Sequence, residues 1–330
     1  MIDPRTDTGI DLRTLDSSAL GTGVAVVVPC FNEAPTVADV VADFRRALPG
    51  ATIHVFDNAS TDATAEIAAA AGAVVHRVTR RGKGNVVRKM FADVEADVYV
   101  MVDGDATYDA DSAPALLELL ARDSLDMVVG ARVPSDAEGE EYRSGHQLGN
   151  RAFTWIYNQL FDCRFDDVFS GYRVFTRRFV KSFPATTGGF DIETELIVHA
   201  ADLQLEVGEH PTPYMARPEG SDSKLSTYKD GLRILLSALR LYRDSFPQRF
   251  FGGFALLATA VAWVLGIPII DEFIRTGLVP RFPTAILAAA LQIIALVLLT
   301  AGLIINSIRQ LSREQRRLAF LSTPRNLVAD

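Results

Sequence analysis

The sequence contains very little cysteine. Among its 330 residues only Cys30 and Cys163 carry a thiol, and they do not follow the spacing of a metal-binding pair. A small secreted domain held together by disulfides is therefore excluded, because such domains are rich in cysteine. Both cysteines have apolar neighbours in the sequence, and we expect them to be reduced residues that pack in the interior.

The chain also lacks an excess of positive charge. Its 33 basic residues face 41 acidic ones, and the formal net charge of −8 argues against a general nucleic-acid-binding protein. Its five histidines follow no metal-ligand spacing and indicate packing or surface positions. The first residues lack the apolar run of a signal peptide, and we expect residues 1–20 to form a disordered cytoplasmic tail.

Two stretches near the C-terminus lack charge altogether. Residues 252–270 and 284–305 contain no Asp, Glu, Lys or Arg, and about 20 such residues suffice to cross a bilayer. A pair of helices buried in a soluble core is the alternative, although core helices usually keep a polar stripe. The short connection, residues 271–283, predicts a transmembrane hairpin over residues 251–306.

The charges that flank this hairpin predict its orientation. Arginines are concentrated before and after it, whereas the connection balances its arginines with acidic residues. Because positively charged flanks stay on the cytoplasmic side, we expect both chain ends and the large N-terminal domain in the cytoplasm. The protein is then a multi-pass protein of the cell (inner or plasma) membrane, with residues 307–330 as a cytoplasmic C-terminal segment. The flanking arginines are Arg240, Arg243 and Arg249 before the hairpin, and Arg309, Arg313, Arg316 and Arg317 after it.

The first two hundred residues alternate apolar runs of strand length with segments of helical period. This alternation predicts a mostly parallel sheet between layers of helices, an α/β fold in which ligands bind at the carboxyl ends of strands. The expected strands are residues 23–28, 52–56, 73–77, 98–102 and 127–130, and the expected helices are residues 35–48, 62–71, 84–95 and 113–122.

The pattern loosens after Arg132. Residues 134–145 are charged and predict a loop, and residues 149–160 and 192–201 predict helices. Residues 218–250 contain an apolar stripe that faces away from lysines and arginines, which is typical of a helix in the membrane interface or of one packed on the soluble domain. Both interpretations stay open.

The strongest chemical signal is the pair Asp103 and Asp105 at the end of an apolar strand. Residues two apart at a strand end project to the same side, and two carboxylates held this close repel each other unless a cation lies between them or one of them is protonated. A divalent, oxygen-liganded ion such as Mg²⁺ or Mn²⁺ removes the repulsion and can also bind a diphosphate. An acidic turn exposed to solvent is the alternative.

Other strand ends carry polar and basic residues. The first strand runs into Pro29-Cys-Phe-Asn-Glu33, and the second runs into Asp57-Asn-Ala-Ser-Thr-Asp62. These side chains can accept hydrogen bonds from a base or a ribose. The basic loop Arg80-Arg-Gly-Lys-Gly84 opens a helix and suits a phosphate, although it is not a P-loop.

These motifs together resemble the nucleotide-sugar half of the family 2 inverting glycosyltransferases, which have the A-type fold. Three further motifs are similar to those of the polyprenyl-phosphate (dolichyl-phosphate-type) mannosyl- and glucosyltransferases: Ser170-Gly-Tyr-Arg173, Gly189-Phe-Asp-Ile-Glu193 and Arg217-Pro-Glu-Gly-Ser-Asp-Ser-Lys224. The resemblance covers roughly residues 23–228 and implies a cytoplasmic catalytic domain over residues 21–217. The hairpin matches the bacterial, membrane-anchored members of that group.

The resemblance implies a role for each matching position. Asp103 would lie by the ribose and the metal, Asp105 would be the main metal ligand, and Lys83 would lie near the diphosphate. Pro29, Glu33 and Asp57 would hold the base and ribose. Residues expected at the donor or acceptor phosphates, or elsewhere on the substrates, are Arg132, Arg143, Arg217, Ser223 and Lys224. Many family members continue the motif as DxDLQ, whereas this chain has Thr107 in place of the glutamine. Metal coordination is therefore expected to depend more on water, Asp105 and the diphosphate.

The expected function is the transfer of a hexosyl group from a nucleotide-diphosphate sugar to polyprenyl phosphate with inversion, for cell-envelope glycan modification. A UDP-linked donor is favoured, and GDP-mannose is the alternative. A polysaccharide-building family 2 transferase is disfavoured, because two spans are too few for an export pore and no QxxRW signature is present. A catalytically dead nucleotide-binding scaffold is disfavoured by the intact Asp103 and Asp105. The expected partners are the sugar donor, the lipid phosphate and the bilayer, not nucleic acid, and the chain could form a homo-oligomer.

Overall fold

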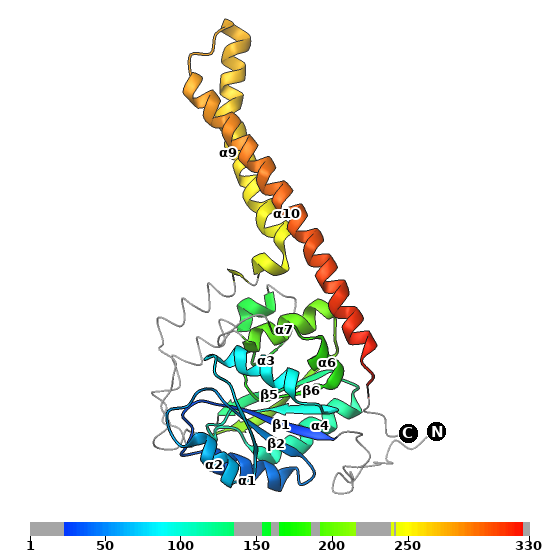
Figure 1. The fold of residues 1–330 in the computed structure, drawn as a ribbon. Helices are drawn as coiled ribbons and strands as arrows, with labels where there is room; N and C mark the ends of the chain where they lie inside the picture. The colour runs from blue at the N-terminus through cyan, green and yellow to red at the C-terminus, as the bar shows by residue number, and fades with distance from the viewer. Residues whose placement is uncertain are drawn as a thin grey trace, which may run out of the picture. The chain divides into compact units, whose positions relative to one another are not determined.

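The structure is a computed structural model that describes residues 23–134, 154–159, 165–185, 192–215, 239–240 and 242–325 (Figure 1). The chain divides into two compact units. The first comprises Met1–Leu232 together with Arg316–Asp330, and the second comprises Arg233–Gln315.

A seven-stranded sheet forms the centre of the first unit. Its strands are β1 (Val24–Cys30), β2 (Thr52–Asp57), β3 (Val74–Arg77), β4 (Val98–Met101), β5 (Met127–Pro134), β6 (Arg173–Thr176) and β7 (Val207–Tyr214). In space the order is β3-β2-β1-β4-β6-β5-β7. All neighbours are parallel except β6, which runs antiparallel to both β4 and β5. The prediction of a mostly parallel sheet is confirmed.

Helices cover both faces of this sheet. On one face α1 contacts both α2 and α4, and on the other face α3 contacts both α6 and α7 (Figure 1). The helices begin and end within a few residues of the predicted limits where a prediction was made. They are α1 (Val37–Ala47), α2 (Thr64–Ala70), α3 (Lys83–Asp93), the 3₁₀ turn η3 (Ala110–Ser112), α4 (Ala113–Arg122), α6 (Arg177–Ser182) and α7 (Ile192–Leu203).

The central strands are apolar on both faces because helices cover both sides of them. Val26, Val27 and Val28 of β1 are fully buried, and so are all four residues of β4. Strand β1 continues past Pro29 to Cys30, contrary to the prediction that Pro29 ends it. Proline fits here because the β1–β4 pairing already ends at Val27, so no ladder bond to β4 is lost.

The second unit consists mainly of two long helices, α9 (Pro247–Thr276) and most of α10 (Phe282–Ser322). Helix α9 runs through the first half of the predicted connection, residues 271–283. Asp271 pairs with Arg275 one turn later, and Gly277 ends the helix in the left-handed conformation with φ 68°. The connection is therefore shorter than predicted.

Both helices are long and apolar enough to cross a membrane. Their most apolar windows are only 17% buried within the structure, so they are not the core helices of a soluble domain. Leu256 is 73% exposed and Ile274 is 76% exposed. Exposed apolar surface of this extent marks contact with a membrane or with another apolar partner.

The last turns of α10 belong to the first unit, where they pack against the sheet domain. The Arg316 guanidinium lies 3.7 Å from the carboxylate of Asp202, and Arg317 donates to the carbonyl of Leu203 at 3.1 Å. Phe320 is buried beneath the guanidinium of Arg178, whose Cζ lies 4.5 Å from the ring centre. Helix α10 thus contributes residues to both units.

Several predicted segments lie wholly or largely outside the described residues. They are the tail over residues 1–20, the loop after residue 134, and most of the amphipathic segment over residues 218–250, of which residues 239–240 and 242–245 are helical. Cys163 also lies outside them. Cys30 is buried, as expected of a residue that packs in the interior.

Candidate functional site

The polar residues predicted to bind ligand gather at one edge of the sheet. Strands β1, β2 and β4 are parallel neighbours, so their carboxyl ends meet. This arrangement brings Glu33, Asp57 and the Asp103–Asp105 pair to the same edge. Lys83 joins them as the first residue of α3.

The loops after β1 and β2 are joined by side-chain hydrogen bonds. Asn32, in a left-handed conformation with φ 54°, accepts from the backbone N–H of Thr61 through its Oδ1, and its own N–H donates to the hydroxyl of Ser60. The N–H of Glu33 donates to the hydroxyl of Thr64 at 2.9 Å. These hydrogen bonds therefore hold the loop after β1 rigidly against the loop after β2.

Two carboxylates predicted to hold the base and ribose lie where these two loops meet. Glu33 is 7% exposed and Asp57 is 6% exposed. Asp57 accepts from the N–H of Ser60 at 3.2 Å, which orients its carboxylate. A Cβ added to Gly104 would lie 3.6 Å from Cγ of Glu33, so Glu33 lies beside the turn that follows β4.

That turn carries Asp105 in a tightly held position. The side chain of Asp105 accepts from the hydroxyl of Thr107 at 2.6 Å and from its N–H at 3.3 Å. Ala106 adopts φ 55°, which turns the chain sharply between them. Gly104 can only be glycine here, because an added Cβ would lie 2.5 Å from Sγ of Cys30. Asp105 is 4% exposed, so its carboxylate is both buried and oriented.

Asp103 is held by a buried cation. Nζ of Lys83 lies 2.6 Å from Oδ1 of Asp103 and 2.6 Å from Oε1 of Glu193, the second residue of α7. Burial opposes the charge on Lys83, but the two carboxylates outweigh it and raise the pKa of Lys83 well above its ordinary value. The other oxygen of Asp103 packs against Gly171, where an added Cβ would collide with the carboxylate.

The basic loop before α3 is shaped by Asn58. Its amide donates to the carbonyls of Val78 and Arg80, and its Oδ1 accepts from the N–H of Gly82 at 2.7 Å. Gly82 has φ 116°, a conformation that other residues rarely adopt. Asn58 thereby fixes the loop that delivers Lys83 to the site.

The Ser170–Arg173 motif packs against Asp103 through Gly171. Arg173 is fully buried and donates to the carbonyls of Val168 and Ser170, and the hydroxyl of Ser170 donates to the carbonyl of Gly130 at 2.6 Å. The N–H of Gly171 donates to the hydroxyl of Tyr108. These bonds hold Gly171 against Asp103 and explain why this motif accompanies the aspartate pair.

Arg132 lies at the end of β5 and is bound to an acidic neighbour. Its Nε and Nη2 donate to the two oxygens of Asp167 at 2.6 and 2.9 Å, and its guanidinium lies over the ring of Tyr214. Burial opposes the charge on Arg132, but Tyr108 and Asp167 outweigh it and raise the pKa of Arg132. Any phosphate at Arg132 would share the guanidinium with Asp167.

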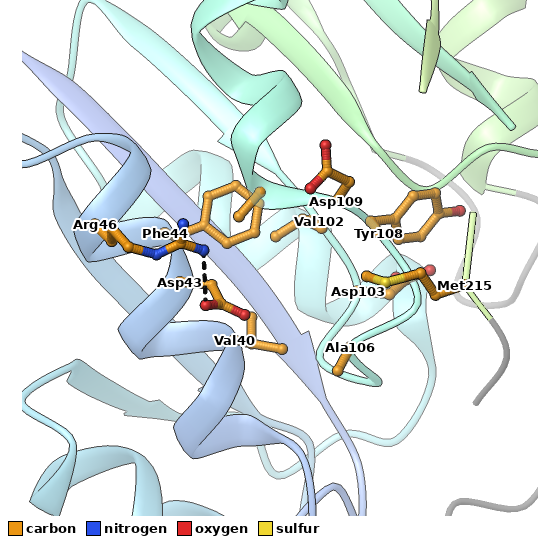
Figure 2. A pocket seen from close by; sticks show the side chains of 11 residues that line it. Val40, Asp43, Phe44, Arg46, Val102, Asp103, Ala106, Tyr108, Asp109 and Met215 are labelled. Carbon is orange, nitrogen blue, oxygen red and sulfur yellow. Dashed lines mark hydrogen bonds and ion pairs between the residues drawn. The ribbon is translucent and has the colours of Figure 1, made fainter. Parts of the chain in front are cut away.

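A cavity of about 150 Å³ lies next to Asp103 (Figure 2). Phe44 and the Asp43–Arg46 ion pair of α1 line one side, and Tyr108 and Met215 line the other. Sites for whole ligands are usually 300–1,000 Å³. This cavity is therefore too small to enclose a nucleotide sugar and forms at most a part of a larger site.

Asp103 and Asp105 fit a divalent, oxygen-liganded cation. Magnesium is typically bound by one or two carboxylates together with substrate phosphates and water. Within the described part of the chain no group of three or more His, Cys, Asp or Glu residues is arranged as metal ligands. Further ligands would therefore come from a diphosphate and water, and Thr107 orients Asp105.

Four predicted substrate-binding residues, Arg143, Arg217, Ser223 and Lys224, lie outside the described residues. Glu193, Gly171 and Asp167 lie in the site although they were not among the residues expected there from the sequence. Glu193 and Gly171 each belong to a motif that resembles those of the polyprenyl-phosphate glycosyltransferases, so these motifs could have indicated them. Asp167 had no such signal.

Comparisons with known proteins agree with this geometry. Residues 25–183 match the family described as glycosyl transferase family 2. Glycosyltransferase AglJ of Haloferax volcanii is 35% identical over 298 residues, which cover 89% of this chain and 96% of that protein. The dolichyl-phosphate hexose transferase of the same organism is 29% identical over 220 residues, covering 66% of this chain and 93% of the relative.

A solved structure shares the fold. It is glucosyl-3-phosphoglycerate synthase from Mycobacterium tuberculosis in complex with Mn²⁺, UDP-glucose and phosphoglyceric acid. The TM-score is 0.56 at 22% identity, covering 70% of this chain and 84% of that one. The sheet order, the strand-end carboxylates and the long match to AglJ lead to one conclusion: the chain is a glycosyltransferase and belongs to glycosyltransferase family 2.

Proposed function

We propose that this enzyme transfers a hexosyl group from a nucleotide-diphosphate sugar, with a UDP-linked donor favoured, to polyprenyl phosphate with inversion. The product, a polyprenyl-phosphate sugar, would serve cell-envelope glycan modification. The observation that carries the proposal is the pair at the carboxyl end of β4, in which Asp105 is buried and Asp103 is ion-paired with Lys83. The relative named as a dolichyl-phosphate hexose transferase supports the acceptor class.

The donor side of the reaction uses the strand-end residues. Glu33 and Asp57 would accept hydrogen bonds from the base and ribose, and Lys83 would meet the diphosphate. Asp103 and Asp105 would hold a divalent ion, Mg²⁺ or Mn²⁺, which stabilises the negative charge on the departing nucleoside diphosphate. The structural neighbour that binds Mn²⁺ and UDP-glucose supports this metal and a uridine donor.

The acceptor side needs little help with proton transfer. A phosphate monoester has a second pKa of about 6, so polyprenyl phosphate is mostly dianionic at neutral pH. Its oxygen bonds to the anomeric carbon, and the bond from that carbon to the diphosphate breaks with its electron pair on the leaving group. Glu193 is ion-paired with Lys83, so the site does not offer this carboxylate as a general base.

The contacts at the end of α10 support the predicted membrane topology. The chain before the two apolar helices and the chain after them belong to the same compact unit, joined by contacts such as Arg317 to Leu203. If both α9 and α10 cross the bilayer, these two parts must lie on the same side. The arginines that flank the hairpin favour the cytoplasmic side.

A donor-by-acceptor assay tests the proposal. Full-length protein in detergent is given UDP-glucose, UDP-N-acetylglucosamine or GDP-mannose, each with a short polyprenyl phosphate, a free oligosaccharide or water alone. We expect transfer to the lipid phosphate with a UDP-linked sugar. Preference for GDP-mannose would select the mannosyltransferase alternative, and transfer to the oligosaccharide alone would overturn the acceptor.

Metal dependence is tested in the same assay. Because Asp105 is buried and oriented as a ligand, EDTA should abolish transfer, and Mn²⁺ or Mg²⁺ should restore it. Asp105→Ala should lower kcat/KM by about 10³-fold or more without unfolding the protein. Asp123→Ala, which removes an exposed carboxylate far from the site in sequence, is the control and should be neutral. Full activity in EDTA would contradict the metal role.

A further inference from the structure

Lys83 forms two ion pairs that the proposed reaction alone does not require. Its ammonium is the centre of a triad, with Asp103, whose side chain is 28% exposed, on one side and Glu193 on the other, each at 2.6 Å. The Lys83 side chain is 12% exposed, and that of Glu193 is 7% exposed.

Lys83 already occupies one carboxylate oxygen of Asp103. Oδ1 of Asp103 is bonded to Lys83, and Oδ2 is packed against Gly171. Asp105 has its Oδ1 bonded to the hydroxyl of Thr107. A divalent ion that arrives alone therefore meets one carboxylate already neutralised by an ammonium, and it must also approach that positive charge.

A nucleotide diphosphate changes this balance. Its oxygens offer Lys83 a second anionic partner, and they bring the ligands that complete the coordination of a divalent ion. Glu193 comes from α7, not from the β4 turn, so it can keep the ammonium in the site after the contact with Asp103 is given up.

We propose that Lys83, steadied by Glu193, is an internal counter-ion that blocks Asp103 from free metal and releases it only when the nucleotide diphosphate binds. Metal binding at Asp103 and Asp105 is then conditional on the nucleotide. By linkage, the metal strengthens nucleotide binding by the same factor. This inference rests on the proposed function, because it concerns the same metal and donor site.

The test measures Mn²⁺ binding directly, without turnover. Free Mn²⁺ is titrated by electron paramagnetic resonance against the full-length protein in detergent, with and without UDP. Wild type should bind Mn²⁺ weakly alone and much more tightly with UDP. In Lys83→Met, Mn²⁺ alone should bind at least about tenfold more tightly, because the competing charge is gone. The factor by which UDP improves Mn²⁺ binding should shrink accordingly.

A double variant distinguishes two causes of tighter Mn²⁺ binding, the loss of the Lys83 contact to Asp103 and the change in net charge. It also guards against misfolding. Lys83→Met leaves Asp103 and Glu193 without their cation, whereas Lys83→Met/Glu193→Gln removes one charge of each sign and keeps the net charge of the triad. If Lys83 acts by occupying Asp103, the double variant should also bind Mn²⁺ alone more tightly than wild type. Lys89→Met is the matched control: Lys89 lies on the same helix and pairs with Asp93 at 2.5 Å, and its loss should leave Mn²⁺ binding unchanged.

The outcomes are distinct. If neither variant binds Mn²⁺ alone more tightly than wild type, while wild type binds Mn²⁺ with UDP, the counter-ion inference is overturned and the proposed function stands. If only the single variant gains affinity, net charge accounts for the effect and the blocking role is overturned. Failure of wild type to bind Mn²⁺ with either UDP or GDP would overturn the metal role in the proposed function, and the inference with it.

Discussion

Thr107 shows how one side chain acquires a role through its neighbour. Its position follows the aspartate pair, where many family members have glutamine, and the sequence suggested only a weaker metal ligand. In the folded chain Thr107 is fully buried, and its hydroxyl donates to Asp105 at 2.6 Å. A hydrogen bond from a buried donor to a ligating carboxylate fixes the direction of the carboxylate and is worth about 1.5–3 kcal/mol. Thr107 is thus a positioning residue for Asp105.

Thr107→Val should therefore weaken metal binding while keeping the shape of the side chain. We expect Mn²⁺ affinity measured with UDP to fall by about 10–100-fold, the usual effect of losing a partner of a metal ligand. Thr107→Ser keeps the hydroxyl and should restore most of the affinity. Equal affinities for the valine variant and wild type would show that the hydroxyl does not position Asp105.

At the scale of elements, strands β2 and β3 carry a pair of histidines that stay neutral. Nδ1 of His54 lies 3.0 Å from Nε2 of His76, which also stacks on Phe56. Burial, and then His76, lower the pKa of His54 to about 4. Burial also lowers the pKa of His76, although Asp93 on α3 opposes the shift and Lys89 adds to it.

This pair predicts a pH dependence of stability. Protonation of His54 occurs near pH 6.5 in the unfolded chain but only near pH 4 in the folded one, so the unfolded chain binds more protons in between. Neutral His54 therefore contributes fully to the stability of the folded chain above about pH 6.5, and this contribution is lost as the pH falls toward 4. His54→Gln should therefore show a smaller decrease in Tm between pH 7 and pH 5 than wild type. Parallel decreases in Tm would contradict the neutral pair.

Also at this scale, the end of α10 stabilises the sheet domain. Phe320 is 7% exposed, and its ring lies under Arg178, which forms a bidentate ion pair with Asp126 at 2.6 and 2.9 Å. Phe320→Ala should lower the free energy of unfolding by about 2 kcal/mol, because it removes a buried ring at the edge of the core. The adjacent Leu321 is 63% exposed, so Leu321→Ala is the control and should change stability by less than about 0.5 kcal/mol. Denaturation in detergent measures both, and equal losses would show that the contact is not stabilising.

At the scale of the whole molecule, the two apolar helices make a prediction about sides of the membrane. Single cysteines placed at Thr276, the last residue of α9, and at Ser322, the last residue of α10, should react with impermeant reagents from opposite sides. The cytoplasmic side should contain Ser322, because the turns before it pack on the sheet domain. Labelling of both positions from one side would contradict the transmembrane hairpin.

Local pattern determined much of this protein. The apolar runs of β1 and β4 are buried on both faces, so their strands could be read directly, as could the uncharged stretches of α9 and α10. The pair Asp103 and Asp105 was visible because two carboxylates at a strand end form a local signal. Strand–helix alternation predicted the mostly parallel sheet between layers of helices, although not the order of its strands.

Tertiary structure alone decided the rest, because the remaining contacts join distant parts of the chain. Strand β6 pairs antiparallel with β4 and β5 and was not among the strands expected from the sequence, because its pairing depends on strands distant in the chain. The triad of Lys83, Asp103 and Glu193 forms only when α3, β4 and α7 meet. Sequence spacing sets which side chains share a strand or helix face, whereas the packing of those elements sets which charges become partners.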